Sequence, residues 1–500
     1  MTSRSWIEPL LSKSVSGVVT KQRSFLYAGV LLMLGLSACG GGGSDGGGSG
    51  NTGGGSTATL LSVSITPVNP ALVNPALAFG GNAQMTARGS YSDGSTQDLT
   101  NLATWQSSAP GVATVDNAGV VTAVAVGEAT ITTTSAGVSG AFPISVDSIV
   151  HLAQTGQDAS YVPGDDGGLQ AGVTWPSPRF TLNECGTPAD ASDDVITDQL
   201  TGLMWVRNHG GSTARTWQGS LDYANALSLC GFDDWRLANV NELESLVVKA
   251  AESGSTWLAG QGFIVSQSSF WSSTTLALFP TRAWNVDVFG GVGEYPKTAT
   301  SSAWAVRGPV AAGAVTLART GQTTCYDAAG GALPSCAGTG QDGALTAGAP
   351  WPSPRFRTDD CGTPADTTDD IIADNLTGLM WPRQANLFGA RTWTDALADA
   401  SGLSLCGYNG DWRLPNQREL RSLVDYQQGV VGNWLTQQGF ENVQAANVTP
   451  CYWTSTSGPS DSANQAACGF LFEGIFAVTI AKTATHYVWP VRRGLVDQAF

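Results

Sequence analysis

The sequence predicts a multidomain protein in which an all-β sandwich is followed by two α+β domains. Short runs of alternating apolar and polar residues, separated by Gly, Asn, Asp and Pro, extend from about residue 60 to 146 and indicate the strands of a sandwich. The segment Thr-Gly-Leu-Met-Trp at 201–205 recurs at 377–381, which indicates two copies of one domain. Each copy combines two helical patterns with several short aromatic strands, and this combination is typical of α+β domains.

The N-terminal segment 1–38 is predicted to be a signal peptide. Basic residues precede an apolar run at 25–36 that is too short to span a bilayer. The run ends in Leu36-Ser37-Ala38-Cys39, which resembles the lipobox of bacterial lipoproteins. This resemblance implies cleavage before Cys39 and attachment of diacylglycerol to its sulfur. An ordinary secretory signal is the alternative.

The residues that follow, 39–58, are almost all Gly and Ser and predict a flexible tether. Such a chain cannot bury apolar surface, and its random-coil reach is about 25 Å. We therefore expect a protein of the bacterial cell envelope that is held by lipid, at the outer membrane or cell surface.

The cysteine count agrees with export. Nine cysteines less the lipidated one leave an even number, as expected in an oxidising compartment. Equal spacing in the two copies, and elimination for the rest, predict four disulfides. A zinc site is the competing interpretation, but the chain has no CxxC pair and only three histidines. The predicted pairs are Cys185–Cys230, Cys361–Cys406, Cys325–Cys336 and Cys451–Cys468.

Residues 59–147 form the predicted sandwich. The segments Tyr91-Ser92-Asp93-Gly94-Ser95 and Thr104-Trp105-Gln106-Ser107-Ser108 carry a resemblance to the bacterial Ig-like (group 2) family. Trp105 is expected between the two sheets. The resemblance implies a spacer that holds the downstream domains away from the membrane.

The repeated domains are predicted at 150–309 and 315–495, called copy one and copy two below. In each copy an Asn begins the second helix and a Glu stands three residues later, which is the pattern of a capping box. The first helix is expected to run from Trp217 through Leu227 to a stop at Cys230-Gly231.

The motif series Thr-Gly-Leu-Met-Trp, Trp-Arg-Leu-(Ala/Pro)-Asn-x-x-Glu-Leu and Trp-(Ser/Thr)-Ser-Thr resembles the Lcl C-terminal domain family in both copies. Trp-Arg-Leu-Pro and the terminal Val-Arg also look like the formylglycine-generating-enzyme branch of C-type-lectin-like folds. These resemblances imply a C-type-lectin-like fold. The family's named member binds sulfated glycosaminoglycans and acts in adhesion.

Charge argues against polyanion binding. The chain has 24 Lys and Arg against 40 Asp and Glu, a net charge of −16, so a sulfated polymer or a nucleic acid meets repulsion. Arg413, Arg418 and Arg421 form the candidate basic cluster in copy two, with solvation of a helix surface as the alternative.

Tryptophan and aspartate supply the other candidates. Most of the 17 tryptophans lie in the fold motifs, and Trp257 and Trp434 are the candidates for exposed sugar contact. Two aspartate-rich loops with equal spacing are candidate calcium sites, because calcium prefers oxygen ligands. The alternative is a pair of exposed turns with local hydrogen bonds. The candidate calcium ligands are Asp190, Asp193, Asp194 and Asp198, and in copy two Asp366, Asp369, Asp370 and Asp374.

An enzyme needs a nucleophile or a redox pair. Cys451 and Cys468 are the only cysteines comparable to the copper-binding pair of formylglycine-generating enzymes, and copy one has no counterparts. The histidines do not recur between copies, so the sequence predicts no enzyme and no resident cofactor apart from the candidate calcium. We expect a surface lipoprotein that presents tandem lectin-like modules for glycan or surface-protein binding in adhesion. The alternatives are a structural envelope protein without a soluble ligand and, less favoured, a copper oxidase.

Overall fold

The computed structural model describes most of the chain after residue 57. The predicted signal peptide, Cys39 and nearly all of the tether therefore lie outside the described residues. Within the described part, no helix is long and apolar enough to cross a membrane. The described residues are 58–67, 76–78, 82–124, 127–147, 149–186, 190–209, 213–249, 254–288, 290–310, 313–444, 450–458, 463–471 and 475–493.

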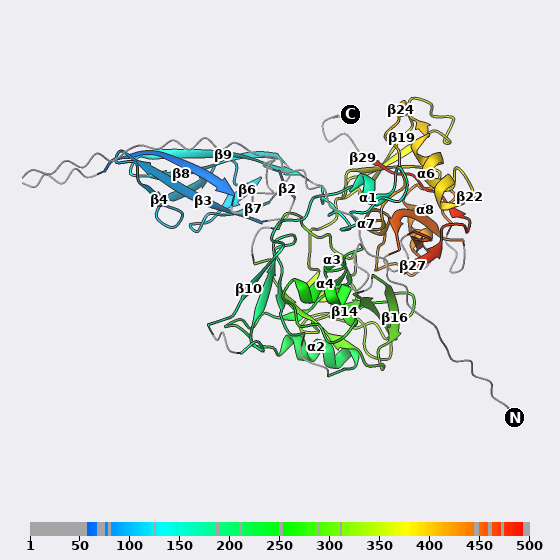
Figure 1. The fold of residues 1–500 in the computed structure, drawn as a ribbon, viewed down its shortest axis with the longest axis horizontal. Helices are drawn as coiled ribbons and strands as arrows, with labels where there is room; N and C mark the ends of the chain where they lie inside the picture. The colour runs from blue at the N-terminus through cyan, green and yellow to red at the C-terminus, as the bar shows by residue number, and fades with distance from the viewer. Residues whose placement is uncertain are drawn as a thin grey trace, which may run out of the picture. The chain divides into compact units, whose positions relative to one another are not determined.

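The first domain is an all-β sandwich, drawn in blue to cyan in Figure 1. One sheet has the order β1-β3-β7-β6, with β4 paired to β3, and the other has the order β2-β9-β8-β5. The strands are β1 (Leu60–Pro67), β2 (Ala76–Ala78), β3 (Asn82–Tyr91), β4 (Thr96–Asp98), β5 (Thr104–Ser107), β6 (Ala113–Val115), β7 (Val120–Ala123), β8 (Gly127–Ser135) and β9 (Val138–Asp147).

Alternation along the strands builds the core of this domain. In β8, the buried residues Ala129, Ile131 and Thr133 point to one face, because successive side chains of a strand point to opposite faces. Trp105 is 7% exposed and its indole N–H donates to the Thr100 carbonyl at 2.8 Å. It fills the interior as expected.

The two copies contain most of the same elements in the same order, and copy two has three further strands of two residues each. Copy one has α1 (Asp166–Leu169), α2 (Trp217–Asn225), α3 (Val240–Ser245), α4 (Gly254–Gly260), β10 (Phe180–Asn183), β11 (Val195–Asp198), β12 (Met204–Val206), β13 (Arg236–Leu237), β14 (Ser269–Thr275), β15 (Arg282–Asp287), β16 (Val292–Pro296), β17 (Ser302–Ala303) and β18 (Ala305–Arg307). Copy two has α5 (Asp342–Leu345), α6 (Trp393–Ser401), α7 (Gln417–Ser422), α8 (Val431–Gln437), β19 (Phe356–Asp359), β20 (Ile371–Asp374), β21 (Leu379–Pro382), β22 (Ala390–Arg391), β23 (Ser404–Leu405), β24 (Tyr408–Asn409), β25 (Tyr452–Ser457), β26 (Gln465–Phe470), β27 (Ile475–Ala481), β28 (His486–Tyr487) and β29 (Arg492–Arg493).

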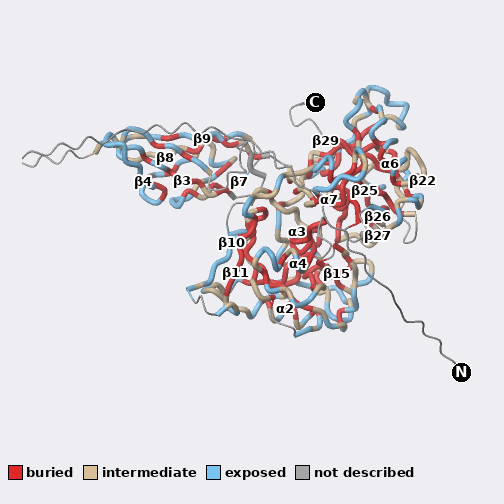
Figure 2. Tube along the Cα trace, in the orientation of Figure 1, coloured by how far each residue is buried: buried red, intermediate tan, exposed pale blue. Residues whose placement is uncertain are grey.

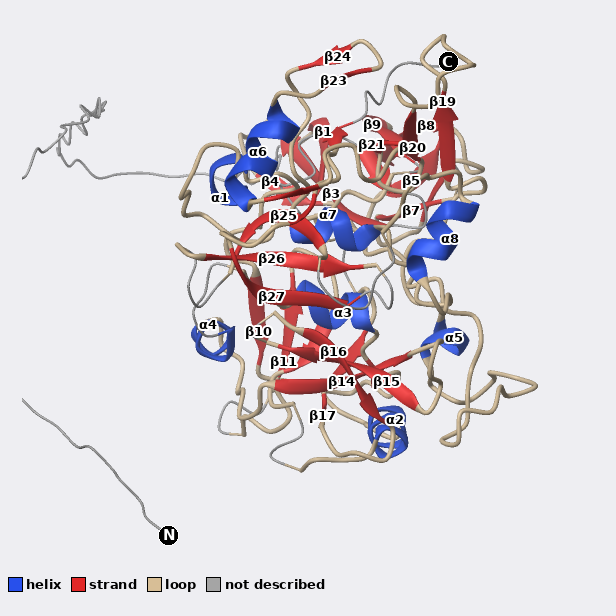
Figure 3. Ribbon diagram, turned by 90° about the vertical axis from the view of Figure 1, so that its right-hand side faces the viewer, coloured by secondary structure: helices blue, strands red, loops and turns tan. Residues whose placement is uncertain are grey.

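The copies share one central sheet. Its order is β17-β14-β15-β16-β27-β26-β25-β28-β22, and the two copies meet where β16 pairs antiparallel with β27 at Val292 and Phe476 (Figure 3). Apart from β22 at one end, the order reads alike from either end, so the copies are related by an approximate twofold axis. Each copy also keeps a smaller sheet, β10-β11-β12-β18-β13 in copy one and β19-β20-β21-β29 in copy two.

The helices are short, and strands make up most of the regular structure. Trp217, Leu221 and Ala224 of α2 are buried, but the helix ends at Asn225, so Leu227 lies beyond it. The predicted stop at Cys230 was placed too late, because the helix already ends where Ala226 bonds back to Asp222 and Ala224. The capping boxes of α3 and α7 are present, and buried segments (red) gather around α3 and β25 in Figure 2.

Eight cysteines form four disulfides, in the same pairs as the spacing predicted. Each copy has one bridge across 45 residues at the same place, and the other two bridges occur in copy two alone. The bridges are Cys185–Cys230, Cys361–Cys406, Cys325–Cys336 and Cys451–Cys468.

We predict that loss of a 45-residue bridge destabilises the protein more than loss of the 11-residue bridge. Chain-entropy arguments give about 4 kcal/mol for the former and about 3 kcal/mol for the latter. Urea unfolding of Cys361→Ser/Cys406→Ser, compared with Cys325→Ser/Cys336→Ser, measures this difference. A larger loss in the second variant would contradict the prediction.

Candidate functional site: two matched pockets

The N-terminal arm of each copy lies mostly on the other copy. We call residues 152–175 arm one and residues 317–351 arm two. Each arm first bonds to its own copy: the Thr155 carbonyl accepts from the Lys249 N–H at 3.1 Å, and the Thr320 carbonyl accepts from the Tyr426 N–H at 2.9 Å. Between these threonines and the tryptophans at the arm ends, which pack on their own copy, the two arms are exchanged.

A glutamine attaches each arm to a strand of the opposite copy. The Gln157 side chain accepts from the Ser457 N–H at 2.9 Å and donates to the Ser457 carbonyl at 3.3 Å. Gln322 does the same with Thr275, at 2.9 and 2.8 Å. Each buried side-chain amide therefore makes two hydrogen bonds with the backbone of one residue, as a neighbouring strand would. These bonds satisfy polar groups that would otherwise be buried without partners.

A buried aspartate lies at the start of the short helix of each arm. Asp166 Oδ2 accepts from the hydroxyls of Thr155, at 2.6 Å, and Thr456, at 2.7 Å. The equivalent Asp342 Oδ2 accepts from its own arm's threonine and from one threonine of copy one, both at 2.7 Å. Each aspartate therefore joins its own arm to the opposite copy.

Burial raises the pKa of both aspartates to about 6. The threonine hydroxyls oppose this rise, and each aspartate also senses one ion pair: Glu419 raises and Arg413 lowers the pKa of Asp166, and Glu242 and Arg236 act likewise on Asp342. The neutral acid is thus favoured by the folded state.

The capping asparagines hold the far end of each arm. Asn239 Oδ1 accepts from the Glu242 N–H at 2.9 Å to cap α3, and its Nδ2 donates to the Ala347 carbonyl of arm two at 3.4 Å. Asn416 caps α7 in the same way and donates to the Ala171 carbonyl of arm one at 3.0 Å. The side chain of each asparagine thus caps a helix of its own copy and also binds the arm of the other copy.

Two pockets of similar size result, one beside each exchanged arm. They have volumes of about 370 Å³ in copy one and 330 Å³ in copy two. Equivalent residues of the two copies line them, and each is completed by the arm of the opposite copy. The shared lining is Thr201, Leu203, Arg236 and Glu242 with Leu345 and Gly348 in copy one, and Thr377, Leu379, Arg413 and Glu419 with Leu169 and Gly172 in copy two.

A two-point ion pair lies in the wall of each pocket. Arg236 donates to both oxygens of Glu242 at 2.7 and 2.5 Å, and Arg413 contacts Glu419 at the same distances. Burial alone would lower the pKa of each arginine, but its glutamate raises that pKa, so the arginine stays protonated. The positive arginine and the negative glutamate together carry no net charge. The pocket walls therefore offer a fixed polar surface.

The sequence prediction of a basic surface cluster in copy two is wrong. Arg413 is committed to Glu419, and Arg421, 7% exposed, pairs with Glu244 of copy one. Arg418 donates to the Val247 carbonyl of copy one at 3.0 Å. These side chains face the other copy, whose position the sequence does not reveal.

Of the two tryptophans predicted to be exposed, Trp434 is buried and Trp257 is half-buried. Trp434 lies on α8, is 9% exposed and packs on Trp351 at 5.9 Å between ring centres. Trp257 lies on α4, is half-buried and packs on Trp175 at 5.6 Å. Both tryptophans stabilise the base of an arm.

The aspartate-rich loops are explained by turns and ion pairs. Asp190 and Asp366 each accept from the backbone N–H two residues later, at 2.9 Å. Among the described residues, the eight candidate aspartates do not come together in any group of three side chains that could hold a metal ion. Asp369 accepts from Thr363 at 2.8 Å, and its copy-one counterpart Asp193 is half-buried. The four ion pairs are Asp194–Arg207, Asp370–Arg383, Asp198–Arg179 and Asp374–Arg355.

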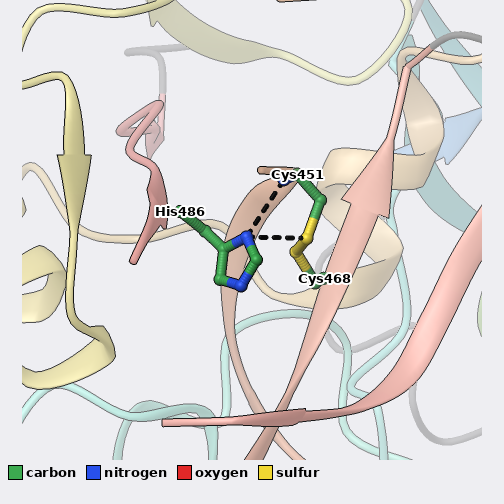
Figure 4. A group of neighbouring side chains, drawn as sticks. All are labelled: Cys451, Cys468 and His486. Atoms are coloured by element: carbon green, nitrogen blue, oxygen red, sulfur yellow. Dashed lines mark hydrogen bonds between the residues drawn. A yellow bond between two sulfur atoms is a disulfide. The ribbon is translucent and has the colours of Figure 1, made fainter. Parts of the chain in front are cut away.

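Cys451, Cys468 and His486 form a compact buried cluster in copy two (Figure 4). The two sulfurs are joined in a disulfide, and His486 Nδ1 accepts from the Cys451 backbone N–H at 3.0 Å. Burial lowers the pKa of His486, which favours the neutral ring. The side chains that could hold a metal ion are thus occupied by a covalent bond and a backbone donor.

Copy one has a hydrogen-bonded network at the equivalent positions. The strand register aligns Ser269, Asn285 and Ser301 with the two cysteines and the histidine. Ser269 donates to Asn285, Asn285 donates to Ser301 at 2.9 Å, and Ser301 donates to the Ser269 carbonyl at 3.0 Å. Both sets of residues cross-link the same strands, one by hydrogen bonds and one by a disulfide.

Sequence reasoning missed the residues that attach the arms. Gln157 and Gln322 belong to the repeated Leu-Ala-x-Thr-Gly-Gln motif, and the aspartates belong to the repeated Asp-Gly-(Gly/Ala)-Leu segment. The insertion between these motifs in copy two breaks their spacing. Their recurrence in spite of the insertion was the signal that could have identified them.

Comparison with known proteins identifies the domains. The model of the Lcl C-terminal domain family matches residues 194–307 and 370–492, and the bacterial Ig-like domain (group 2) model matches 62–146. The protein is thus a modular chain built from domains of these two families. It contains one bacterial Ig-like domain and two Lcl C-terminal domains.

Individual relatives are distant. Ice-binding protein 1 of Shewanella frigidimarina is 33% identical over 114 residues, which is 20% of this chain and 13% of that protein. The intimin mutant of EHEC O157:H7 is 13% identical and covers 50% of this chain and 98% of its own, with a TM-score of 0.15. The Yersinia pseudotuberculosis adhesin InvE is 9% identical and covers 86% and 96%, with a TM-score of 0.15.

We predict that the protein loses stability as the pH rises from about 4 to 7. The folded pKa of Asp166 and Asp342 is about 6, against an ordinary value of 3.8. The folded state therefore holds more protons in this window, and the stability present below pH 4 is lost as the pH passes 6. The pKa difference corresponds to at most about 3 kcal/mol per aspartate.

The variant Asp166→Asn/Asp342→Asn keeps an acceptor for the threonines and removes the titration. Urea unfolding between pH 4 and 8 should give a flatter profile than the wild type and greater stability at pH 7. The matched control, Asp190→Asn/Asp366→Asn, changes exposed aspartates and should leave the decline in place. An equal decline in both variants would refute the assignment.

Proposed function

We propose that this protein is an exported, lipid-anchored binding protein of the bacterial cell surface, of the adhesin type. Its Ig-like domain serves as a spacer, and its paired Lcl domains present two equivalent ligand pockets. The observation that carries the proposal is the matched pair of pockets, each walled by residues that both copies retain. The domain composition supports a surface role.

The pockets suit a small, uncharged part of a larger ligand. Volumes of about 330 and 370 Å³ lie at the lower end of the range for ligand sites. One exposed leucine from each arm, Leu169 at 45% and Leu345 at 38% exposure, supplies an apolar contact beside the polar ion-pair wall. A sugar ring combines these two surface characters, as does a short peptide segment. We propose a glycan or a surface protein as the ligand.

We also propose that the protein is not an enzyme. Arg236 and Arg413 are each held by a glutamate, and each of these glutamates also accepts from a capping backbone N–H at 2.8 Å. Arg493, which is exposed, also lines the copy-two pocket. The cysteine and histidine cluster of copy two corresponds to a serine and asparagine network in copy one. This equivalence supports a cross-linking role for the cluster.

Binding is expected to depend on the two exposed leucines. Leu169→Ser removes the apolar contact in one pocket and Leu345→Ser in the other, and neither change removes a buried side chain. On a multivalent surface each single variant should lose about 10²-fold in avidity, because two sites act together. The double variant should lose binding. A glycan array and adhesion to cells, both with labelled protein, measure these effects.

Leu102→Ser provides the control, because Leu102 is 68% exposed in the Ig-like domain. It should bind as the wild type does. If the wild type binds no glycan and no cell surface, a structural envelope role replaces the proposal. If the double variant binds normally, the pockets are not the site.

Lipid attachment is expected at Cys39, because Leu36-Ser37-Ala38-Cys39 resembles a lipobox. Cys39→Ala should abolish labelling with radioactive palmitate and move the protein from the membrane to the soluble fraction. Continued labelling of the variant would show that Cys39 is not the attachment site.

A further inference from the structure

The centre of the two-copy unit contains a charge difference between equivalent positions. Two residues after the capping glutamate, α3 carries Glu244 and α7 carries Arg421. These two side chains form an ion pair across the approximate twofold axis, and they are 5% and 7% exposed. A position near such an axis faces its own counterpart, so its charge decides which copies can pair.

The surroundings of Glu244 reinforce the difference. Its Oε1 also accepts from Lys249, whose ammonium donates to the Gly290 carbonyl at 3.1 Å. Burial alone would raise the pKa of Glu244, but Lys249, Arg421 and Arg418 lower it, so the carboxylate is charged. In copy two the position of Lys249 is taken by Tyr426, which packs on Trp284 of copy one at 5.4 Å.

A second pair of equivalent positions shows the same division. Arg418 of α7 reaches the end of α3 and donates to the Val247 carbonyl at 3.0 Å. Its counterpart Asn241 is neutral and donates to the Ala318 carbonyl of arm two at 3.1 Å. Copy two thus contributes two arginines to the centre, Arg418 and Arg421. Copy one contributes Glu244, the carboxylate that pairs with Arg421.

We propose that Glu244 and Arg421 are specificity determinants that restrict arm exchange to one copy of each kind. The partner of copy one is a copy two, in the same chain or in a second chain. Two copies of the second kind would place Arg421 against Arg421, with both Arg418 side chains nearby and no carboxylate at this position. Two of the first kind would place Glu244 against Glu244, each with only its own Lys249.

The restriction matters because each pocket is completed by an arm from the other copy. A copy without its correct partner lacks one pocket wall and exposes the strand that receives the arm. Pairing of the copies does not depend on the identity of the ligand. A negative binding experiment would therefore leave the proposed pairing untouched, and a negative pairing experiment would leave the proposed ligand untouched.

Cleavage of the folded full-length chain tests the proposal. A specific protease site is inserted between Ala311 and Ala312, in the connection between the copies, and the protein is cut after folding. The two fragments of the wild type should stay together as a one-to-one complex in sedimentation. Glu244→Arg and Arg421→Glu should each weaken this association at least tenfold. The exchange variant Glu244→Arg/Arg421→Glu should bring it back to within about threefold of the wild type.

Controls separate pairing from folding. Glu244→Gln keeps the side-chain shape, should fold as judged by circular dichroism, and should weaken association less than Glu244→Arg does. Arg88→Glu changes an exposed arginine of the Ig-like domain and should leave association unchanged. If the single variants fold but associate as tightly as the wild type, or if the exchange variant is no better than the single ones, the proposal is overturned.

Mixing tests the partner from a second chain. Two cut wild-type proteins with different tags are incubated together at high concentration, and native mass spectrometry identifies the complexes. Complexes of copy one from one chain with copy two from the other are expected. Complexes of two like copies at similar abundance would overturn the proposal.

Discussion

The exchange of arms depends on a carboxyl group buried without a matched cation. Asp166 and Asp342 each receive two threonine hydroxyls, one from their own arm and one from the opposite copy. Such a group is stabilised in the interior by the hydrogen bonds that it accepts. Both threonine bonds are made only while the arm lies on the other copy. The aspartate thus ties the conformation of the arm to the pairing of the copies, and through the arm to the shape of each pocket.

Duplication within one chain makes an asymmetric partnership possible. In a dimer of identical chains, every substitution near the twofold axis appears twice, and Glu244 would face itself. After duplication the two positions can diverge, and here one copy carries the acid and the other the base. The same freedom explains the strand cross-link, which uses hydrogen bonds around Asn285 in one copy and the Cys451–Cys468 bridge in the other. A short connection also keeps the partners at a high effective concentration.

Features that depend on nearby sequence could be predicted, and features that depend on the partner copy could not. The capping boxes at Asn239 and Asn416 follow from residues three apart, and two of the four disulfide pairs follow from equal spacing in the two copies. The burial of Arg421 and Trp434 depends on the residues that cover them, and these residues lie far away in the sequence. The repeat also makes the exchange impossible to read from the sequence. The residues that receive an arm occur in both copies, so the sequence does not show which copy the arm contacts.

The buried arginines narrow the proposed ligand class. An acidic chain with a net charge of −16 could bind a sulfated polymer only through clustered free cations, yet Arg413 and Arg421 neutralise glutamates and Arg418 binds backbone carbonyls. Breaking such a buried pair to release a cation would leave a carboxylate without its partner, which costs about 3–5 kcal/mol. The ion-paired arginines of the pocket walls therefore add no net charge that would attract a polyanion, and Arg493 is the further arginine that lines the copy-two pocket. We therefore propose that recognition rests on apolar contact and hydrogen bonds, which favours an uncharged sugar or peptide segment over a glycosaminoglycan as the ligand.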